Sequence, residues 1–287
     1  MNKDVELQHL IKVKVSTVDG NEVQVTVPVV GDNEVSVTDI HTKVCKSLGL
    51  QKTSSLWFSL FFGKNILLIK RLKPESRTPS TTTELCLRKW CFNKEIETQL
   101  IKDDPAACHL VYLEAKSAIS SGLLKVSQEQ QEKLEEYEDP GFTLKEKFVL
   151  LAHSLEDYFS VLIKDCKITD NERNGNTPQV FNNGAIRVSV DGIRIYKDKY
   201  LAVLEWKRLK KWLIHKKLSR IILLYLNPHE ELETIVTETC QCEYLLAAIN
   251  QIVRELQVSS PNDSFFYSSM ISTNEDGSVA YENALFK

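Results

Sequence analysis

Apolar and polar residues alternate along much of the last third of the chain, which is the pattern of strands buried on one face. Four short runs of this kind follow one another at 201–206, 210–216, 221–226 and 232–237. Residues 242–256 then repeat apolar side chains at helical spacing. The order predicts a small antiparallel β module with one C-terminal helix. Modules of this type bind peptides or lipids in the crease between a strand and the helix, because an open strand edge accepts another chain.

The first 92 residues show strand patterns around one helix. Apolar side chains alternate at 11–15 and 23–27, on either side of an Asp19-Gly20 turn, and predict a β-hairpin. A helix is predicted at 38–48, a polar loop at 73–83, and buried strands at 57–62, 66–72 and 85–92. This is the order of a ubiquitin-like fold. We therefore expect an N-terminal extension at 1–9 and a ubiquitin-like lobe at 10–92.

Helical signals replace the β pattern between residues 93 and 158. Asp104 before Pro105 is typical of a helix start, and Ser127 with Gln130 matches a capping box. Three helices are predicted in a helical lobe at 93–158. The β pattern returns in a third lobe at 159–257, and residues 258–287, rich in Ser, Asn and Asp, are predicted to form a flexible tail. The predicted fold class is α+β with three lobes.

The composition is that of a soluble globular protein, since 43% of the 287 residues are hydrophobic. The sequence contains no run of about 18 apolar residues, and its N-terminus is polar, so we expect a cytoplasmic protein. Its seven cysteines are odd in number and lack the paired spacing of zinc sites, which favours reduced, buried thiols. We expect no cofactor, no metal and no nucleic-acid partner.

The net charge of −3 hides an uneven distribution. Residues 194–220 contain ten basic side chains and only two acidic ones, so an anionic partner should favour this face. The alternative is a solvated strand face on which lysines prevent aggregation. The candidates for an anionic lipid or an acidic ligand are Lys207, Arg208, Lys210, Lys211, Lys216 and Lys217.

No catalytic motif is found. The phosphate-binding glycine loops and the nucleophile elbow are missing from the sequence, and His229-Glu230-Glu231 lacks the second histidine of a zinc-protease helix. These observations argue against an enzyme.

Several short strings resemble a known family. A ubiquitin-like lobe, a helical lobe and a β lobe with a C-terminal helix, in this order, resemble a FERM module. The strings that narrow the resemblance to the FERM-like region of the cargo-sorting sorting nexins are WFSLF at 57–61, IKRL at 69–72, LRKWCF at 87–92, LEW at 204–206 and KW at 211–212. The resemblance spans roughly residues 10–257.

The resemblance implies a function in recognition. In that family the third lobe resembles a phosphotyrosine-binding (PTB) domain of the PH/PTB-like class. It captures Asn-Pro-x-Tyr or Asn-x-x-Tyr/Phe motifs in the cytoplasmic tails of membrane receptors, for endosomal sorting. The resemblance therefore implies an adaptor that can be peripheral on the endosomal membrane, where the family's phox-homology domain binds phosphoinositide.

An extended ligand in such a lobe would pair with the strand at 210–216, and its side chains would enter pockets formed with the helix. Trp212 resembles the family's aromatic on the strand that lines this groove. The alternative is that the same side chains simply fill the core. The candidate peptide-binding residues are Trp212, Leu213, Ile214 and His215 on the strand, and Leu245, Ala248, Ile249 and Ile252 on the helix.

The tail carries a sequence that fits the same kind of motif. Tyr281, Asn283 and Phe286 match the pattern aromatic-x-Asn-x-x-Phe, so the protein could supply its own ligand. About 25 residues separate the end of the predicted helix from Tyr281, and such a linker reaches roughly 25–30 Å. The alternative is a chance match in a polar tail.

A second functional hypothesis is a FERM scaffold that binds a small GTPase through the ubiquitin-like lobe and anionic membrane lipid through the basic face. The predicted strand at 23–27 has only Lys12 and Lys14 as basic neighbours, which disfavours GTPase binding through that strand.

Overall fold

The computed structural model describes residues 9–30, 33–64, 67–79, 84–138, 142–171, 179–197, 200–259, 268–273 and 279–283. These residues belong to two compact units. One unit comprises Met1–Cys91 with Glu95–Tyr158, and the other comprises Phe92–Lys94 with Phe159–Lys287. The predicted ubiquitin-like and helical lobes thus lie together in the first unit, and the predicted third lobe lies in the second.

The first unit contains a seven-stranded sheet in the order β5-β4-β7-β1-β2-β3-β6. Its strands are β1 (Leu10–Ser16), β2 (Glu22–Val30), β3 (Glu34–Ser36), β4 (Phe58–Lys64), β5 (Leu67–Arg71), β6 (Arg77–Pro79) and β7 (Leu85–Lys89). β1 and β2 form the predicted hairpin, and β1 runs parallel to β7. β3 and β6 were not predicted, and β6 lies within the segment expected to be a loop.

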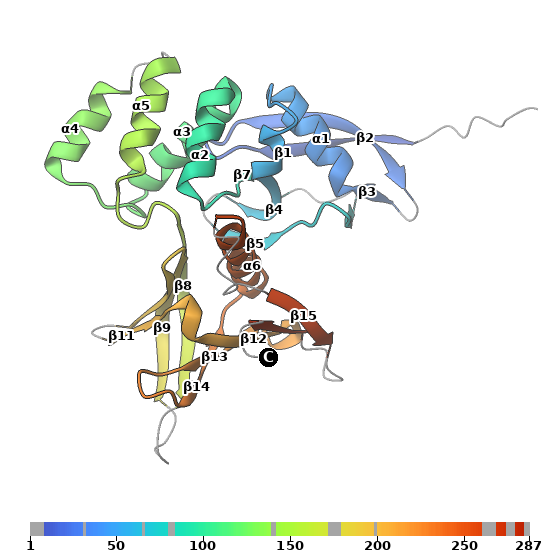
Figure 1. Ribbon diagram of the computed structural model, residues 1–287. Coiled ribbons are helices and arrows are strands. Elements are labelled where there is room, and N and C mark those ends of the chain that lie inside the picture. The colour runs from blue at the N-terminus through green and yellow to red at the C-terminus, as the bar shows by residue number, and fades with distance from the viewer. Residues whose placement is uncertain are drawn as a thin grey trace, which may run out of the picture. The chain divides into compact units, whose positions relative to one another are not determined.

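One helix, α1 (Val37–Ser47), packs on this sheet (Figure 1). It begins where the Ser36 hydroxyl accepts a hydrogen bond from the N–H of Asp39, and it buries Ile40 and Val44 completely. A short 3-10 helix, η1 (Ser54–Trp57), leads into β4. The strands packed against α1 match the predicted ubiquitin-like lobe.

The helical lobe contains four helices, one more than predicted: α2 (Lys94–Asp103), α3 (Pro105–Ser120), α4 (Gln128–Glu136) and α5 (Phe142–Ala152). α3 and α4 begin where the sequence predicts. Asp104 accepts hydrogen bonds from the N–H groups of Ala106 and Ala107, and Ser127 forms the capping box with Gln130. α2 is the helix that was missed.

The buried carboxylate of Glu97 in α2 ties the sheet to the helices of this unit. It accepts hydrogen bonds from Lys89 Nζ on β7 at 2.5 Å and from the Tyr158 hydroxyl at 2.7 Å, and it lies 3.0 Å from His153 Nε2. Burial alone would raise the pKa of Glu97, but the charge of Lys89 and the bond to His153 hold this pKa below its ordinary value of 4.5. The carboxylate therefore stays ionised without contact with water.

The second unit contains a nine-stranded sheet in the order β11-β10-β9-β8-β14-β13-β12-β16-β15. Its strands are β8 (Ser160–Asn171), β9 (Gln179–Ser189), β10 (Gly192–Lys197), β11 (Tyr200–Leu204), β12 (Leu209–His215), β13 (Arg220–Leu226), β14 (Leu232–Glu238), β15 (Ser268–Thr273) and β16 (Val279–Asn283). The helix α6 (Cys242–Ser259) packs on the sheet, as predicted. Two 3-10 helices, η2 (Trp206–Arg208) and η3 (Lys216–Leu218), flank β12.

Residues 258–287 were expected to form a flexible tail, but β15 and β16 lie in this range. They pair with each other in antiparallel fashion, and β16 also joins the sheet. The fold is therefore the predicted α+β arrangement, extended by a C-terminal hairpin.

All seven cysteines are free, and only Cys240 is exposed. Burial raises the pKa of Cys45 to about 12 and that of Cys86, Cys108 and Cys166 to about 11. These four thiols stay protonated near neutral pH, in line with the prediction of reduced, buried cysteines.

The first prediction concerns Glu97. Glu97→Gln removes the charge that pairs with Lys89 inside the first unit, so it should lower the free energy of unfolding by about 3–5 kcal/mol in urea denaturation. Because the pKa of Glu97 is depressed in the folded state, the carboxylate stabilises fully above its ordinary pKa, and this stabilisation is lost as pH falls through the depressed folded-state value. The variant should therefore lose less stability on acidification than the parent.

The variant Glu129→Gln, at an exposed position, serves as the control. An equal loss of stability in both variants would contradict the assigned role of Glu97.

Candidate functional site

The edge of β12 is covered by a strand from the C-terminal segment. β12 pairs with β13 on one side and with β16 on the other, both antiparallel. The partners across the β12–β16 pair are Lys211 and Glu282, Trp212 and Tyr281, Leu213 and Ala280, and Ile214 and Val279. β15 follows on the outside of β16. The strand that the sequence predicts to bind an extended ligand is thus paired here with a strand of the same chain.

An aromatic pair anchors this added strand. The rings of Trp212 and Tyr281 lie parallel within 6°, with centroids 6.1 Å apart. Trp212 Nε1 donates a hydrogen bond to Asn250 Oδ1 on α6 at 3.3 Å, and the Asn250 side chain also bonds to Tyr281. Burial raises the pKa of Tyr281 above its ordinary value of 10, so this hydroxyl is neutral at physiological pH. Asn250 thus links the helix, the edge strand and the docked strand.

The predicted peptide-binding residues fall into two groups. On β12, Trp212 and Ile214 are buried, with at most 1% of their surface exposed. The four predicted helix residues are buried to the same degree. Leu213 and His215 alternate with them on the other face of the strand and are only half-buried. The residues gathered between the edge strand and α6 are Trp212, Ile214, Leu245, Ala248, Ile249 and Ile252. With β16 in place, they are continuous with the core.

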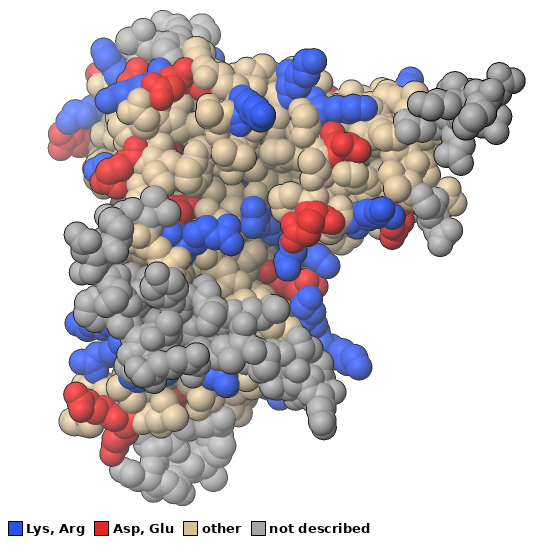
Figure 2. Space-filling view, turned by 45° about the vertical axis from the view of Figure 1, so that its right-hand side comes forward, with Lys and Arg blue, Asp and Glu red and all other residues tan. Residues whose placement is uncertain are grey.

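The basic face is partly neutralised by two acidic side chains: Glu205, which lies within the basic run, and Glu243, which lies outside it. Lys207 and Arg208 both approach Glu205, at 2.8 and 3.8 Å, and Lys216 lies 3.8 Å from Glu243. On the face seen in Figure 2, Lys and Arg side chains lie beside Asp and Glu. Lys211, the register partner of Glu282, has no ion pair among the described residues. The charge available to a partner is thus smaller than the sequence suggests.

Sequence reasoning missed two parts of this site. Asn250 gave no signal, because a single polar residue in an apolar helix is common. The pairing of Val279 and Ala280 with β12 could not be inferred from a segment classified as flexible. Tyr281 and Asn283 of the proposed internal ligand lie in β16, whereas Phe286 lies outside the described residues.

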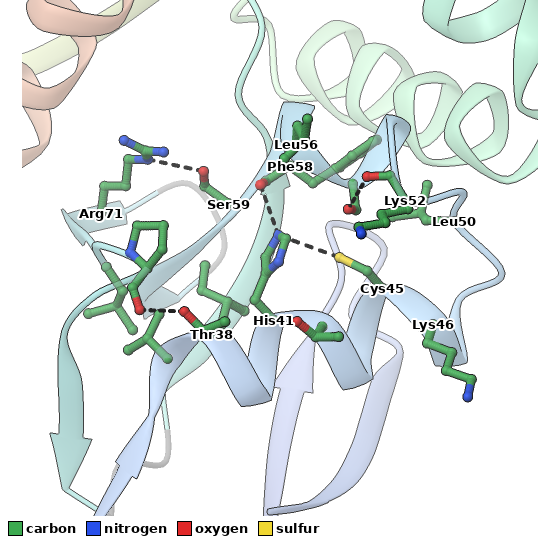
Figure 3. Close-up of a pocket in the computed structure, with 16 residues that line it drawn as sticks. Thr38, His41, Cys45, Lys46, Leu50, Lys52, Leu56, Phe58, Ser59 and Arg71 are labelled. Carbon is green, nitrogen blue, oxygen red and sulfur yellow. Dashed lines mark hydrogen bonds between the residues drawn. The ribbon is translucent and has the colours of Figure 1, made fainter.

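A second concavity lies in the ubiquitin-like lobe. It has a volume of about 540 Å³ and opens between α1, η1 and β5 (Figure 3). Among the described residues, no three His, Cys, Asp or Glu side chains are grouped to hold a metal ion. No helix in these ranges is both long and apolar enough to span a membrane.

Comparison with solved structures identifies the fold as that of a FERM module. The FERM and C-terminal domain complex of Drosophila Merlin matches with a TM-score of 0.62 and 14% identity, over 88% of this chain and 98% of that chain. The MyTH4-FERM MF2 domain of Dictyostelium discoideum myosin VII matches with a TM-score of 0.61 and 10% identity, over 88% of this chain and 60% of that one. The chain thus spans about three fifths of the myosin fragment.

No protein-family model and no curated protein matches the sequence. At these identities the solved structures establish the fold alone. The FERM part of the sequence resemblance is confirmed, and the likeness to sorting nexins stays a prediction.

The second prediction tests the aromatic anchor. Trp212→Ala and Tyr281→Ala should each speed amide hydrogen exchange in β16, because each removes half of the stacked pair. Their effects should be less than additive, with a coupling of about 0.5–1.5 kcal/mol in a double-mutant cycle. Tyr137→Ala, at the end of α4, is the control. Additive effects would show that the two rings do not interact.

Proposed function

We propose that the protein is a non-enzymatic adaptor that binds extended peptide segments by strand addition to β12. The ligands are Asn-Pro-x-Tyr or Asn-x-x-Tyr/Phe motifs in the cytoplasmic tails of membrane receptors. The observation that carries the proposal is the pairing of β16 with the edge of β12. It supports a groove that is able to hold an extended chain.

The geometry of the docked strand indicates how a ligand would bind. Backbone hydrogen bonds to an edge strand supply affinity that depends little on sequence, while alternate side chains give specificity. The aromatic side chain of Tyr281 occupies the position opposite Trp212, and Asn283 follows two residues later. An asparagine here favours a turn by bonding its own backbone, which would direct the next aromatic residue toward the helix.

The same geometry supports the internal ligand. Twenty-odd residues separate the end of α6 from Tyr281. A ligand segment tethered over this chain length has an effective concentration on the order of millimolar at the groove. With an intrinsic Kd of about 10 μM, the C-terminal strand would occupy the groove roughly 99% of the time. Glu282 is the register partner of Lys211 in this pairing. Drosophila Merlin offers a parallel, since its FERM domain forms a complex with a C-terminal domain.

Membrane attachment belongs to the proposal only in a weaker form. The ion pairs of Lys207, Arg208 and Lys216 leave less charge for an anionic lipid than the sequence suggests. We therefore propose that contact with the endosomal membrane comes chiefly through the receptor tail and not through this face. No specific contact among the described residues supports binding of a small GTPase.

The third prediction is a calorimetric titration of an Asn-Pro-x-Tyr receptor-tail peptide into the full chain. The variant Tyr281→Ala frees the groove, so it should bind the peptide with a Kd of about 10 μM, roughly 100-fold more tightly than the parent chain. Adding Trp212→Ala should weaken that binding about tenfold or more, because the ring under the ligand is lost.

Tyr137→Ala is the matched control and should behave like the parent chain. If the parent and Tyr281→Ala bound the peptide equally, the internal ligand would be refuted, but the peptide-binding groove would still be supported. If no variant gave heat with the peptide, the adaptor function itself would be wrong.

A further inference from the structure

The cavity in the ubiquitin-like lobe lies beside α1, between this helix, η1 and the strands β4 and β5 (Figure 3). α1 has 11 residues, about 16 Å of helix, and it packs on β2, β3 and the beginning of β4. β5, η1 and the segment after β5 form the opposite wall. The space between them, about 540 Å³, lies in the size range of small-molecule sites.

The inside of this cavity is apolar. Phe58 and Leu60 of β4 line it and are buried, with 3% and 1% of their surface exposed, whereas Leu56 of η1 is 74% exposed. A leucine this exposed beside an apolar cavity leaves hydrocarbon surface in water, which an apolar ligand would cover.

Three of the polar groups on the walls have partners within the lobe. His41 Nε2 lies 3.0 Å from the carbonyl oxygen of Phe58, and the Thr38 hydroxyl donates to the carbonyl of Pro74 at 2.6 Å. Ser59 accepts from Arg71 Nε at 3.0 Å. A peptide strand would bring backbone N–H and C=O groups that such walls cannot satisfy, at a cost for each group. An aliphatic chain brings none.

The charges around the cavity are all positive. Its lining includes Lys46, Lys52 and Arg71 but no Asp or Glu. Arg71 is engaged with Ser59 and lies over the Trp90 ring. In Figure 3, the Lys52 side chain extends over the cavity, whereas Lys46 points away from it. Burial, together with the charge of Arg71, holds the pKa of His41 below its ordinary value, so this ring adds no charge near neutral pH.

We propose that this cavity binds a single-chain anionic amphiphile of the long-chain fatty-acid class. The hydrocarbon chain lies between α1 and β5 against Phe58 and Leu60, and the carboxylate pairs with the ammonium group of Lys52. This site does not depend on the peptide groove of the other unit.

The test is a fluorescence titration of the full chain with monomeric cis-parinaric acid, a long-chain fatty acid that brightens in an apolar site. Saturable binding at micromolar concentration is expected, with displacement by oleate. Lys52→Met should weaken binding about tenfold, because the carboxylate loses its charged partner. Leu56→Glu should weaken binding at least as much, because it places a negative charge beside the carboxylate of the bound fatty acid. Both residues are exposed, so both variants should fold.

The matched controls lie outside the cavity: Lys43→Met on α1 and Leu218→Glu at a leucine of the second unit that is also exposed, at 51% of its surface. Both should bind like the parent chain. The proposal is overturned if parinaric acid does not bind, if its methyl ester binds as tightly, or if the controls weaken binding as much as the cavity variants. A second arm uses phosphatidylserine vesicles. Binding to vesicles without binding of the monomeric acid would assign the lipid contact to a membrane surface and also overturn the proposal.

Discussion

The edge strand of an open β-sheet has unpaired backbone N–H and C=O groups. The second unit of this protein is organised around this constraint. The outer edge of β12 presents backbone N–H and C=O groups beside the apolar surface of α6, and such edges pair readily with any extended chain that reaches them. β16 fills the edge here, with Tyr281 against Trp212 and Asn250 bonded to both. The arrangement of β12, α6 and the C-terminal hairpin follows from satisfying this one edge.

Strong local patterns allowed much of the fold to be predicted. The β1–β2 hairpin, the start of α3 at Asp104 and the apolar repeat of α6 each depend on residues close in sequence. Elements that depend on tertiary pairing were missed. β3 and β6 have three residues each, too few for a period to show, and α2 is mostly polar outside Leu100 and Ile101. β15 and β16 pair with each other, and β16 also pairs with β12. Their own composition favours a flexible segment, so only this pairing makes them strands.

The candidate site was predicted in part for the same reason. Trp212 and the apolar positions of α6 stood out by residue type and spacing, but Asn250 could be recognised only from the two rings that it bonds. The basic run is also weaker in space than in sequence, since Glu205 within the run pairs with its neighbours and Glu243 of α6 lies beside Lys216. The cavity beside α1 had no sequence signal, because its walls come from α1, η1, β4 and the segment after β5, which are brought together only by the fold.

The most direct test of the β12 edge as the binding site is to lock it. Leu213 and Ala280 are register partners, so cysteines at both positions should form a disulfide on mild oxidation, in a Cys240→Ser background that removes the exposed native thiol. The oxidised chain should then fail to bind an Asn-Pro-x-Tyr peptide, and reduction should restore the weak binding of the parent chain, while Leu213→Cys alone responds to neither treatment. Peptide binding by the locked chain that equals binding by the reduced chain would contradict the account.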